Sequence, residues 1–265
     1  KSNALKLLAN ASYGYQGFFG ARYYCREAAA SAAALARIKI LETISLIEKN
    51  NFKVIYSDTD SISFLQGTHS KKEVEILLKN INDHLPGIME LDLEGFFKRG
   101  IWVSKRTGNL GAKKKYALLD ENDKIKIRGF ETVRRDWCTL ARETQNHVLE
   151  LVLKEGDEKK AVVFVKKIIN DLKKRIISLD KLIIRTQLKK SIEEYKSVNP
   201  HVTIAQKMKE KGLPVHIGML VEYYIAEPKD RKKSLIRERA RMIDEKGDYD
   251  IDYYLKNQIL PAVEN

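Results

Sequence analysis

Residues 56–61, Tyr-Ser-Asp-Thr-Asp-Ser, constrain the fold of this chain more than any other stretch. They lie between two short apolar runs, 52–55 and 62–65, and apolar runs on both sides of a polar turn predict a β-hairpin. Because side chains alternate along a strand, we expect Asp58 and Asp60 to share one face at the hairpin tip. Neighbouring carboxylates repel one another unless a cation lies between them, and hard oxygen ligands suit Mg²⁺. The motif therefore suggests metal-assisted phosphoryl or nucleotidyl transfer; the alternative is an ordinary solvated Asp-x-Asp turn.

The formal net charge of +13 favours a polyanionic partner, and nucleic acid is preferred over a membrane. This charge is concentrated, because residues 98–135 hold twelve Lys and Arg against four Asp and Glu, a surplus of eight. A generally Lys-rich surface, as in heat-adapted proteins, is the alternative, but it does not account for this concentration.

The remaining composition bounds the location of the protein. No run of about 18 apolar residues is present, so no membrane-spanning helix and no membrane partner are expected. The two cysteines, Cys25 and Cys138, are far apart and give no support to a zinc site or a disulfide framework. The first residues have neither a signal-peptide pattern nor an initiator Met. We expect an intracellular protein of the cytoplasm or nucleoid, or of the nucleus in a eukaryote, and a chain that is part of something longer.

The hydrophobic pattern predicts an α+β fold with a boundary near residue 135. Before this boundary the pattern predicts helices over 1–14, 22–49 and 71–84, and strands at the hairpin, over 89–104 and around the turn 120–123. Beyond it, helices dominate, over 136–154, 158–176, 202–211 and 250–263, with short strands at 182–185 and 215–225. In the segment 89–104, Glu90, Asp92 and Glu94 form either a solvated strand face or an auxiliary metal site.

The first helix carries a polar stripe. Lys6, Asn10 and Tyr13 are spaced at i, i+4 and i+7, so they lie on one side of the helix. An ammonium and an amide one turn apart suit a triphosphate, because they offer a point charge and a directional donor. An ordinary polar helix face is the alternative.

Several motifs together resemble those of family B DNA polymerases. Residues 6–14 resemble the K-x-x-x-N-x-x-Y-G fingers motif, and residues 56–61 resemble the Y-G-D-T-D-S palm motif, with Ser57 in place of the usual Gly. The two occur in the family's order and at about its spacing. The stretch 111–116 looks like the K-K-x-Y element, 128–137 looks like the stretch leading into the thumb, and 195–201 and 253–263 look like thumb landmarks. The resemblance covers nearly the whole chain.

The resemblance implies an antiparallel palm sheet with packed helices and a mainly helical thumb. It implies a fingers helix and a palm helix in 1–50, the palm in 51–135 and the thumb in 136–265. Lys6 and Asn10 would contact the triphosphate of a dNTP, and Tyr13 would pack near the nascent base pair. Asp58 and Asp60 would hold two Mg²⁺ ions for nucleotidyl transfer to a primer 3′ end.

The family also carries an upstream aspartate, in a D-x-x-S-L-Y-P-type motif, that completes the metal site, and no such motif occurs here. We therefore expect this chain to be the C-terminal piece of a split or truncated polymerase, incomplete without an N-terminal chain or segment. Whether it binds a sliding clamp stays open.

The concentration of basic residues in 98–135 then predicts contacts with primer–template DNA. If residues 111–116, which we call the Lys-rich element, form a regular strand, Lys113 and Lys115 share one face, and Lys114 and Tyr116 share the other. A strand edge protected by lysines is the alternative. The expected DNA contacts are Lys113, Lys114, Lys115, Tyr116, Arg128, Arg134 and Arg135; ion pairs with Asp136 or Glu131 are an alternative for the arginines.

Two other functions remain open. One is a non-catalytic DNA-binding subunit of a replication or repair complex, whose motifs only position DNA. The other is a different palm-type nucleotidyltransferase, such as a cyclase, but it does not account for the basic strand or the helical second half. The presence of both aspartates favours a polymerase.

Overall fold

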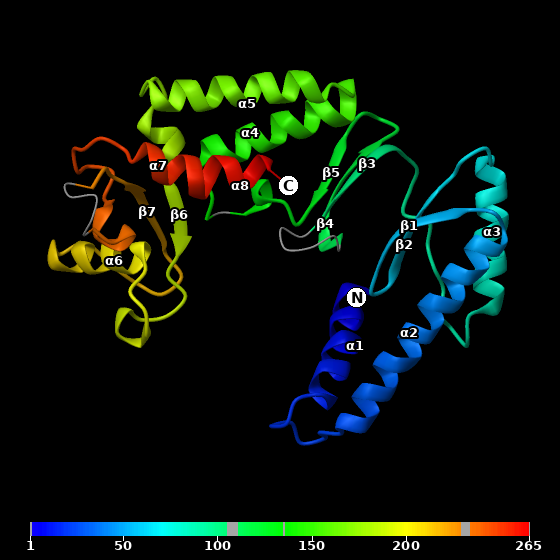
Figure 1. Ribbon diagram of the computed structural model, residues 1–265. Coiled ribbons are helices and arrows are strands. Elements are labelled where there is room, and N and C mark those ends of the chain that lie inside the picture. Colours follow the sequence, from blue (N-terminus) through cyan, green and yellow to red (C-terminus); the bar gives the residue numbers. More distant parts are fainter. Residues whose placement is uncertain (1, 105–110, 135, 229–233, 265) are drawn as a thin grey trace. The chain divides into compact units, whose positions relative to one another are not determined.

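The computed structural model describes residues 2–104, 111–134, 136–228 and 234–264. The chain divides into two compact units, residues 1–95 and 96–265, each described here by itself (Figure 1). Helices and antiparallel strands are mixed along the chain, which confirms the expected α+β class. The division into fingers, palm and thumb at residues 50 and 135 stays a prediction.

The first unit combines two long helices, a hairpin and a shorter helix. Its elements are α1 (Ser2–Gln16), α2 (Arg26–Lys49), β1 (Lys53–Asp58), β2 (Ser61–Leu65) and α3 (Lys71–His84). The Ala-rich sequence of α2 favours a long helix, because Ala has the highest helix propensity. A capping box at Ser70 and Glu73 begins α3, and the hydrogen bonds from Ser70 lower the pKa of Glu73 to about 2.

Buried apolar residues lie on the elements around the hairpin. Ile47 near the end of α2, Phe52 before β1, and Val74, Leu77 and Ile81 on α3 are all buried. Their spacing of three and four residues on α3 is that of one helix face. Helix α2 contacts both β1 and α3.

The prediction of a strand over residues 89–104 is wrong for the first half of this range. Residues 88–96 form no strand or helix, and β3 begins only at Phe97. The side chain of Asn82 takes the place of a neighbouring strand, because it donates to the Leu91 carbonyl at 3.1 Å and accepts from the Leu91 amide at 2.9 Å. Glu90, Asp92 and Glu94 therefore do not line a regular strand face.

The second unit begins with a three-stranded antiparallel sheet. Its strands are β3 (Phe97–Ser104), β4 (Gly111–Asp120) and β5 (Ile125–Arg128), with β4 in the centre. The inner face packs on the end of α4 (Thr139–Glu150) and the π-helical turn Leu151–Glu155 that follows it. The buried residues of this cluster are Val103, Ala117, Leu119, Phe130, Leu149 and Leu153.

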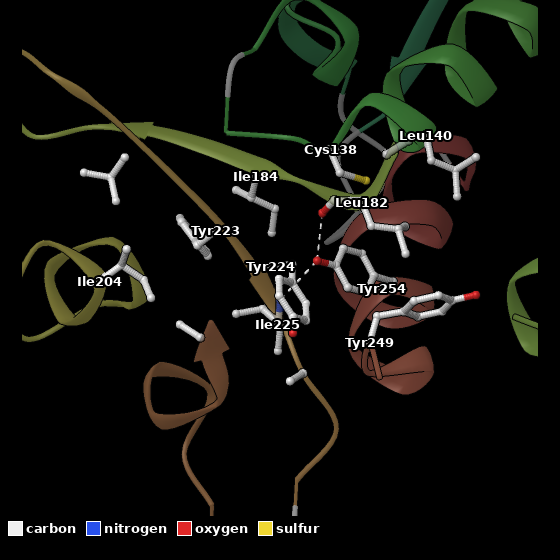
Figure 2. Packing of buried hydrophobic residues seen from close by; sticks show 14 of the residues in the cluster. Cys138, Leu140, Leu182, Ile184, Ile204, Tyr223, Tyr224, Ile225, Tyr249 and Tyr254 are labelled. Atoms are coloured by element: carbon white, nitrogen blue, oxygen red, sulfur yellow. Dashed lines mark hydrogen bonds between the residues drawn. The ribbon is translucent and has the colours of Figure 1, made fainter. Parts of the chain in front are cut away.

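A larger core occupies the rest of the second unit. It lies between a second antiparallel sheet and several helices, and residues from Cys138 to Ile259 contribute to it (Figure 2). The sheet consists of β6 (Ile184–Gln187), β7 (Leu220–Ile225) and β8 (Ala240–Arg241), and the helices that contribute are α4, α5 (Glu158–Lys173), α6 (Pro200–Glu210) and α7 (Ile251–Tyr254). The last helix in the described chain is α8 (Leu260–Val263).

Tyr254 connects distant parts of this core. Its ring is fully buried, and its hydroxyl donates to the Leu182 carbonyl at 2.8 Å and accepts from the Ile225 amide at 3.1 Å (Figure 2). Burial raises the pKa of this hydroxyl well above its ordinary value, so it stays protonated and able to donate. Tyr254 on α7 is thereby joined to the 3₁₀ turn Leu179–Leu182, which precedes β6, and to β7.

Among the residues that the structure describes, no helix is long and apolar enough to cross a membrane.

Candidate functional site

Helix α1 presents the polar stripe to solvent. Every residue from Asn3 to Tyr15 is exposed, and the Tyr13 side chain keeps 51% of its surface accessible. Within the described part of the chain, no carboxylate forms an ion pair with Lys6 or a hydrogen bond with Asn10. The ammonium, the amide and the phenol ring therefore lie along one open side of the helix, where a ligand has access to all three.

The hairpin tip carries both aspartates, in a different way from that expected. Asp58 is the last residue of β1 and pairs with Ser61, whereas Asp60 lies in the two-residue turn between the strands. Strand alternation therefore does not apply to this pair. Asp58 is half-buried and Asp60 is exposed.

The turn itself is tight and strained. Thr59 has a φ of +56°, and the Asp60 amide donates to the Asp58 carbonyl at 2.7 Å, a γ-turn pattern with positive φ. A positive φ is a true outlier for a β-branched residue and costs about 1–3 kcal/mol. The Thr59 hydroxyl donates to the Asp58 carboxylate at 3.1 Å, and the Ser61 hydroxyl donates to the Asp58 carbonyl at 3.1 Å. These bonds hold the Asp58 carboxylate and the turn in one arrangement.

The donor set at the tip fits a hard cation in its chemistry but not in its number. Two carboxylates supply the oxygen ligands that Mg²⁺ prefers. Within the described residues, no cluster of three or more His, Cys, Asp or Glu side chains is placed to hold a metal ion. Further ligands for a cation at Asp58 and Asp60 therefore have to come from bound phosphates, water or another polypeptide segment.

The Lys-rich element does not alternate as a regular strand. Lys114 has a φ of +59°, and the pairing of β4 with β3 shifts between Trp102 and Ser104, opposite this stretch. The expectation that the side chains of residues 113–116 alternate between the two faces of a strand is therefore wrong at Lys114. The backbone of Lys113 belongs to β4, but its side chain lies outside the described residues.

Gly129 makes this irregular backbone possible. A Cβ at this position would lie 2.0 Å from the Lys114 carbonyl oxygen, and Gly129 has a φ of +69°. Only a residue without a side chain tolerates both the close approach and the backbone conformation. The motif glycine thus shapes the Lys-rich element.

Lys115 lies in an ion pair within the protein. Its ammonium is 2.7 Å from Glu131 and 5.1 Å from the centre of the Phe130 ring, and the Lys115 and Glu131 side chains are only 14% and 13% exposed. Burial raises the pKa of Glu131, but the hydrogen bonds from Lys115 and Gln145 outweigh it, so the pKa stays below its ordinary value. Lys115 is thus held by an internal ion pair, and its contact with DNA stays a prediction.

Gln145 connects this ion pair to the end of α8. Its side-chain amide donates to Glu131 at 2.7 Å and to the Ala262 carbonyl, while its oxygen accepts from the Thr132 amide at 2.7 Å. Gln145 is only 1% exposed. The sequence analysis missed this residue; the available signal was a polar residue on the apolar side of α4, one turn from Ala141 and Leu149. We call Lys115, Glu131 and Gln145 the buried polar network.

The three arginines lie in different surroundings. Arg128 is exposed at the end of β5, and no carboxylate forms an ion pair with it among the described residues. Arg134 instead forms two bonds with Asp136, at 3.0 and 2.6 Å, which raise the pKa of Arg134. Arg135 lies outside the described residues. Of these three arginines, Arg128 is the one whose guanidinium is described and forms no ion pair.

Comparison with known proteins adds to this geometry. The family model described as DNA polymerase family B matches residues 1–265. A DNA polymerase of Thermococcus gorgonarius is 42% identical over 273 residues, covering 100% of this chain and 34% of that protein. A DNA polymerase of Methanocaldococcus jannaschii is 43% identical, covering 96% of this chain and 15% of that protein.

A solved structure gives the same picture. The family B DNA polymerase of Pyrobaculum calidifontis aligns with a TM-score of 0.66 at 35% identity, over 98% of this chain and 32% of that one. The chain therefore spans about a third, or less, of the length of the polymerases to which it is similar.

Proposed function

Because the chain belongs to DNA polymerase family B, we propose that it is the C-terminal catalytic portion of a DNA-directed DNA polymerase. It would add deoxynucleotides to a primer 3′ end by nucleotidyl transfer. The observation that carries this proposal is the strained hairpin tip, which presents Asp58 and Asp60 together in a chain that the family model matches throughout. Strained backbone conformations concentrate at functional sites, where the arrangement of the side chains matters more than stability.

In this proposal Asp58 and Asp60 hold divalent cations. When bound there, Mg²⁺ would supply the positive charge that activates the attacking hydroxyl and neutralises the leaving pyrophosphate. The bond from Thr59 keeps the Asp58 carboxylate oriented, and the bond from Ser61 to the Asp58 carbonyl holds the turn, so that little reorganisation is needed when the substrates arrive. Positioning of this kind supplies most of the catalysis in phosphoryl-type transfer.

Lys6 and Asn10 would bind the triphosphate of the incoming dNTP, and Tyr13 would pack against the nascent base pair. Their exposure on one side of α1 supports these roles. In the Lys6→Ala variant, we expect the KM for dNTP to rise about 10- to 100-fold, because one charge-assisted hydrogen bond is lost. Steady-state primer extension by the assembled polymerase measures this change.

Lys79→Ala is the matched control for Lys6, because Lys79 is an exposed lysine on α3 of the same unit. It should leave the KM unchanged. An unchanged KM in the Lys6 variant would contradict the assigned phosphate contact.

The DNA contacts of the second unit would follow the phosphate backbone. Arg128 is the described residue best suited to such a contact, whereas Lys115 is held by Glu131. Replacing Arg128 with Gln should reduce the slope of log Kd against log salt by about 0.9, as expected for one phosphate contact. Lys115→Met should leave the slope unchanged, and fluorescence anisotropy with labelled primer–template measures both. Equal changes in the two slopes would show that Lys115 also contacts a DNA phosphate.

A further polypeptide segment would complete the site. Leucines on α1 and α2 are 60–72% exposed, more apolar surface than an isolated unit normally leaves uncovered; they are Leu5, Leu7, Leu8, Leu35 and Leu41. We propose that an N-terminal segment or chain of the polymerase covers this surface and supplies another carboxylate.

Primer extension by the assembled polymerase with Asp60 replaced by Ala tests the function as a whole, since a non-catalytic DNA-binding subunit would tolerate the change.

A further inference from the structure

The turn between α1 and α2 displays aromatic rings to solvent. Six aromatic residues lie within residues 13–24, and all six are exposed, from 44% for Tyr24 to 82% for Phe19. Tyr23 and Phe18 are 68% and 54% exposed. We propose that residues 17–25, which we call the aromatic turn, form a stacking platform for single-stranded template, an inference that rests on the proposed polymerase function.

The aromatic turn is ordered by its own hydrogen bonds and not by packing of its rings. The Ala21 amide donates to the Phe18 carbonyl at 2.9 Å, and the Cys25 amide donates to the Gln16 carbonyl at 3.0 Å. The Arg22 amide donates to the Tyr15 hydroxyl at 3.0 Å. These bonds fix the backbone while the rings stay outside, so the platform is formed before any ligand binds. Such preorganisation reduces the entropy lost on binding.

At one point of this arrangement a glycine leaves room for an aromatic ring. A Cβ on Gly20 would lie 2.8 Å from the Phe18 ring. Phe18 also contacts Phe19, with ring centres 5.1 Å apart. The two rings therefore support one another above a glycine that leaves them room, and Phe19 remains the most exposed of the aromatic side chains.

The charge of the segment identifies the kind of partner. The first 26 residues contain four Lys and Arg and no Asp or Glu. The Arg22 guanidinium lies 5.5 Å from the centre of the Tyr23 ring, so a planar cation and an aromatic ring are presented together. A flexible polyanion with flat bases matches both features, and stacking on aromatic rings accepts every base. A protein partner would also use Arg and aromatic residues, but it would not require the absence of acidic residues.

The position of the turn agrees with this assignment. Tyr13 lies in the last turn of α1, and the aromatic turn follows it directly. Under the proposed function Tyr13 packs at the nascent base pair, so the next template bases to be copied would be near the aromatic turn. A platform there would hold unpaired template without reading its sequence, as a polymerase requires.

The experiment compares two DNA substrates on the assembled polymerase. One is a blunt primer–template duplex, and the other is the same duplex with a single-stranded 5′ template extension. We expect Phe19→Ala and Tyr23→Ala to weaken binding of the extended substrate about tenfold each and to leave binding of the blunt duplex unchanged. Tyr23→Phe should bind like the wild type, and Tyr23→Leu should bind like the Ala variant, because leucine is apolar but has no ring face for a base.

Other results would overturn the inference. Equal weakening on both substrates, or wild-type binding by Tyr23→Leu, would show that the ring does not stack on unpaired template. Loss of co-elution between the variant chain and the rest of the polymerase would instead assign the aromatic turn to a protein interface. If the wild-type assembly extends primers but the Ala variants bind both substrates normally, only this inference fails. If the wild-type assembly extends no primer, the proposed function fails.

Discussion

Primer extension by the assembled polymerase should fall at least about a thousandfold when Asp60 is replaced by Ala. Asp60 would lose the carboxylate that holds a divalent cation against the triphosphate, and such charge stabilisation is worth several kcal/mol in the transition state. Each 1.36 kcal/mol corresponds to a factor of ten in rate. Single-turnover extension at saturating dNTP measures the change without interference from product release.

Duplex binding should persist in the same variant, because the proposed phosphate contacts lie on the second unit and not at the hairpin tip. Asp83→Ala is a matched control, since Asp83 is an exposed aspartate on α3 of the same unit. It should extend primers at the wild-type rate. Normal extension by the Asp60→Ala variant would remove the enzyme interpretation and favour a subunit that only positions DNA.

The largest effect on stability is expected from Glu131→Ala. This variant leaves the Lys115 ammonium partly buried without its ion-pair partner and removes one acceptor of the buried Gln145 amide. Because both charged side chains retain some exposure, we expect the free energy of unfolding of the second unit to fall by about 2–4 kcal/mol. Both tryptophans of the chain, Trp102 and Trp137, belong to this unit, so their fluorescence during urea unfolding reports it selectively.

Two comparisons isolate the cause of that loss. Glu193→Ala removes an ion pair with Lys209 in which both side chains are 66% exposed, and it should leave the stability nearly unchanged. Combining Glu131→Leu with Lys115→Met removes both charges, and it should recover much of the stability lost in Glu131→Ala. If the double variant is as unstable as the single one, the unpaired lysine is not the source of the loss.

Local pattern was sufficient for most helices and for the hairpin. The periodicity of residues 71–84 predicts α3 with its bounds, because the buried residues Val74, Leu77 and Ile81 repeat at helical spacing. The segment 89–96 shows the limit of this reasoning. Its alternation resembles a strand, but a strand also needs a neighbour, and here the Asn82 side chain bonds the backbone instead.

The motifs indicate which residues form the candidate site, but not its detailed geometry. The motifs indicate Lys6, Asn10, Asp58 and Asp60 directly, and the structure places the first two on one open side of α1 and the other two at one hairpin tip. Positive φ angles at Thr59 and Lys114 break the side-chain alternation expected for both motifs. Neither Thr nor Lys favours a positive φ, so nothing in the sequence indicates this conformation.

The buried polar network lay beyond local reasoning for a different reason. Gln145 bonds to Ala262, which is 117 residues away, and to Glu131 on a separate 3₁₀ turn. A pattern of neighbours along the chain carries no information about such partners. The sequence around Lys115 predicts a DNA contact for this lysine but gives no sign of its ion pair with Glu131.

The placement of residues 254–263 has a consequence for synthesis. Gln258 accepts a hydrogen bond from the Cys138 amide at 2.8 Å, and Tyr254 bonds to Leu182 and Ile225. These bonds close the larger core of the second unit with a segment that the ribosome makes more than a hundred residues after Cys138. Until this segment has been synthesised, the earlier helices and strands leave part of their apolar surface exposed. The nascent chain is therefore expected to need protection by chaperones until this segment emerges, and pauses in translation just before it should increase aggregation.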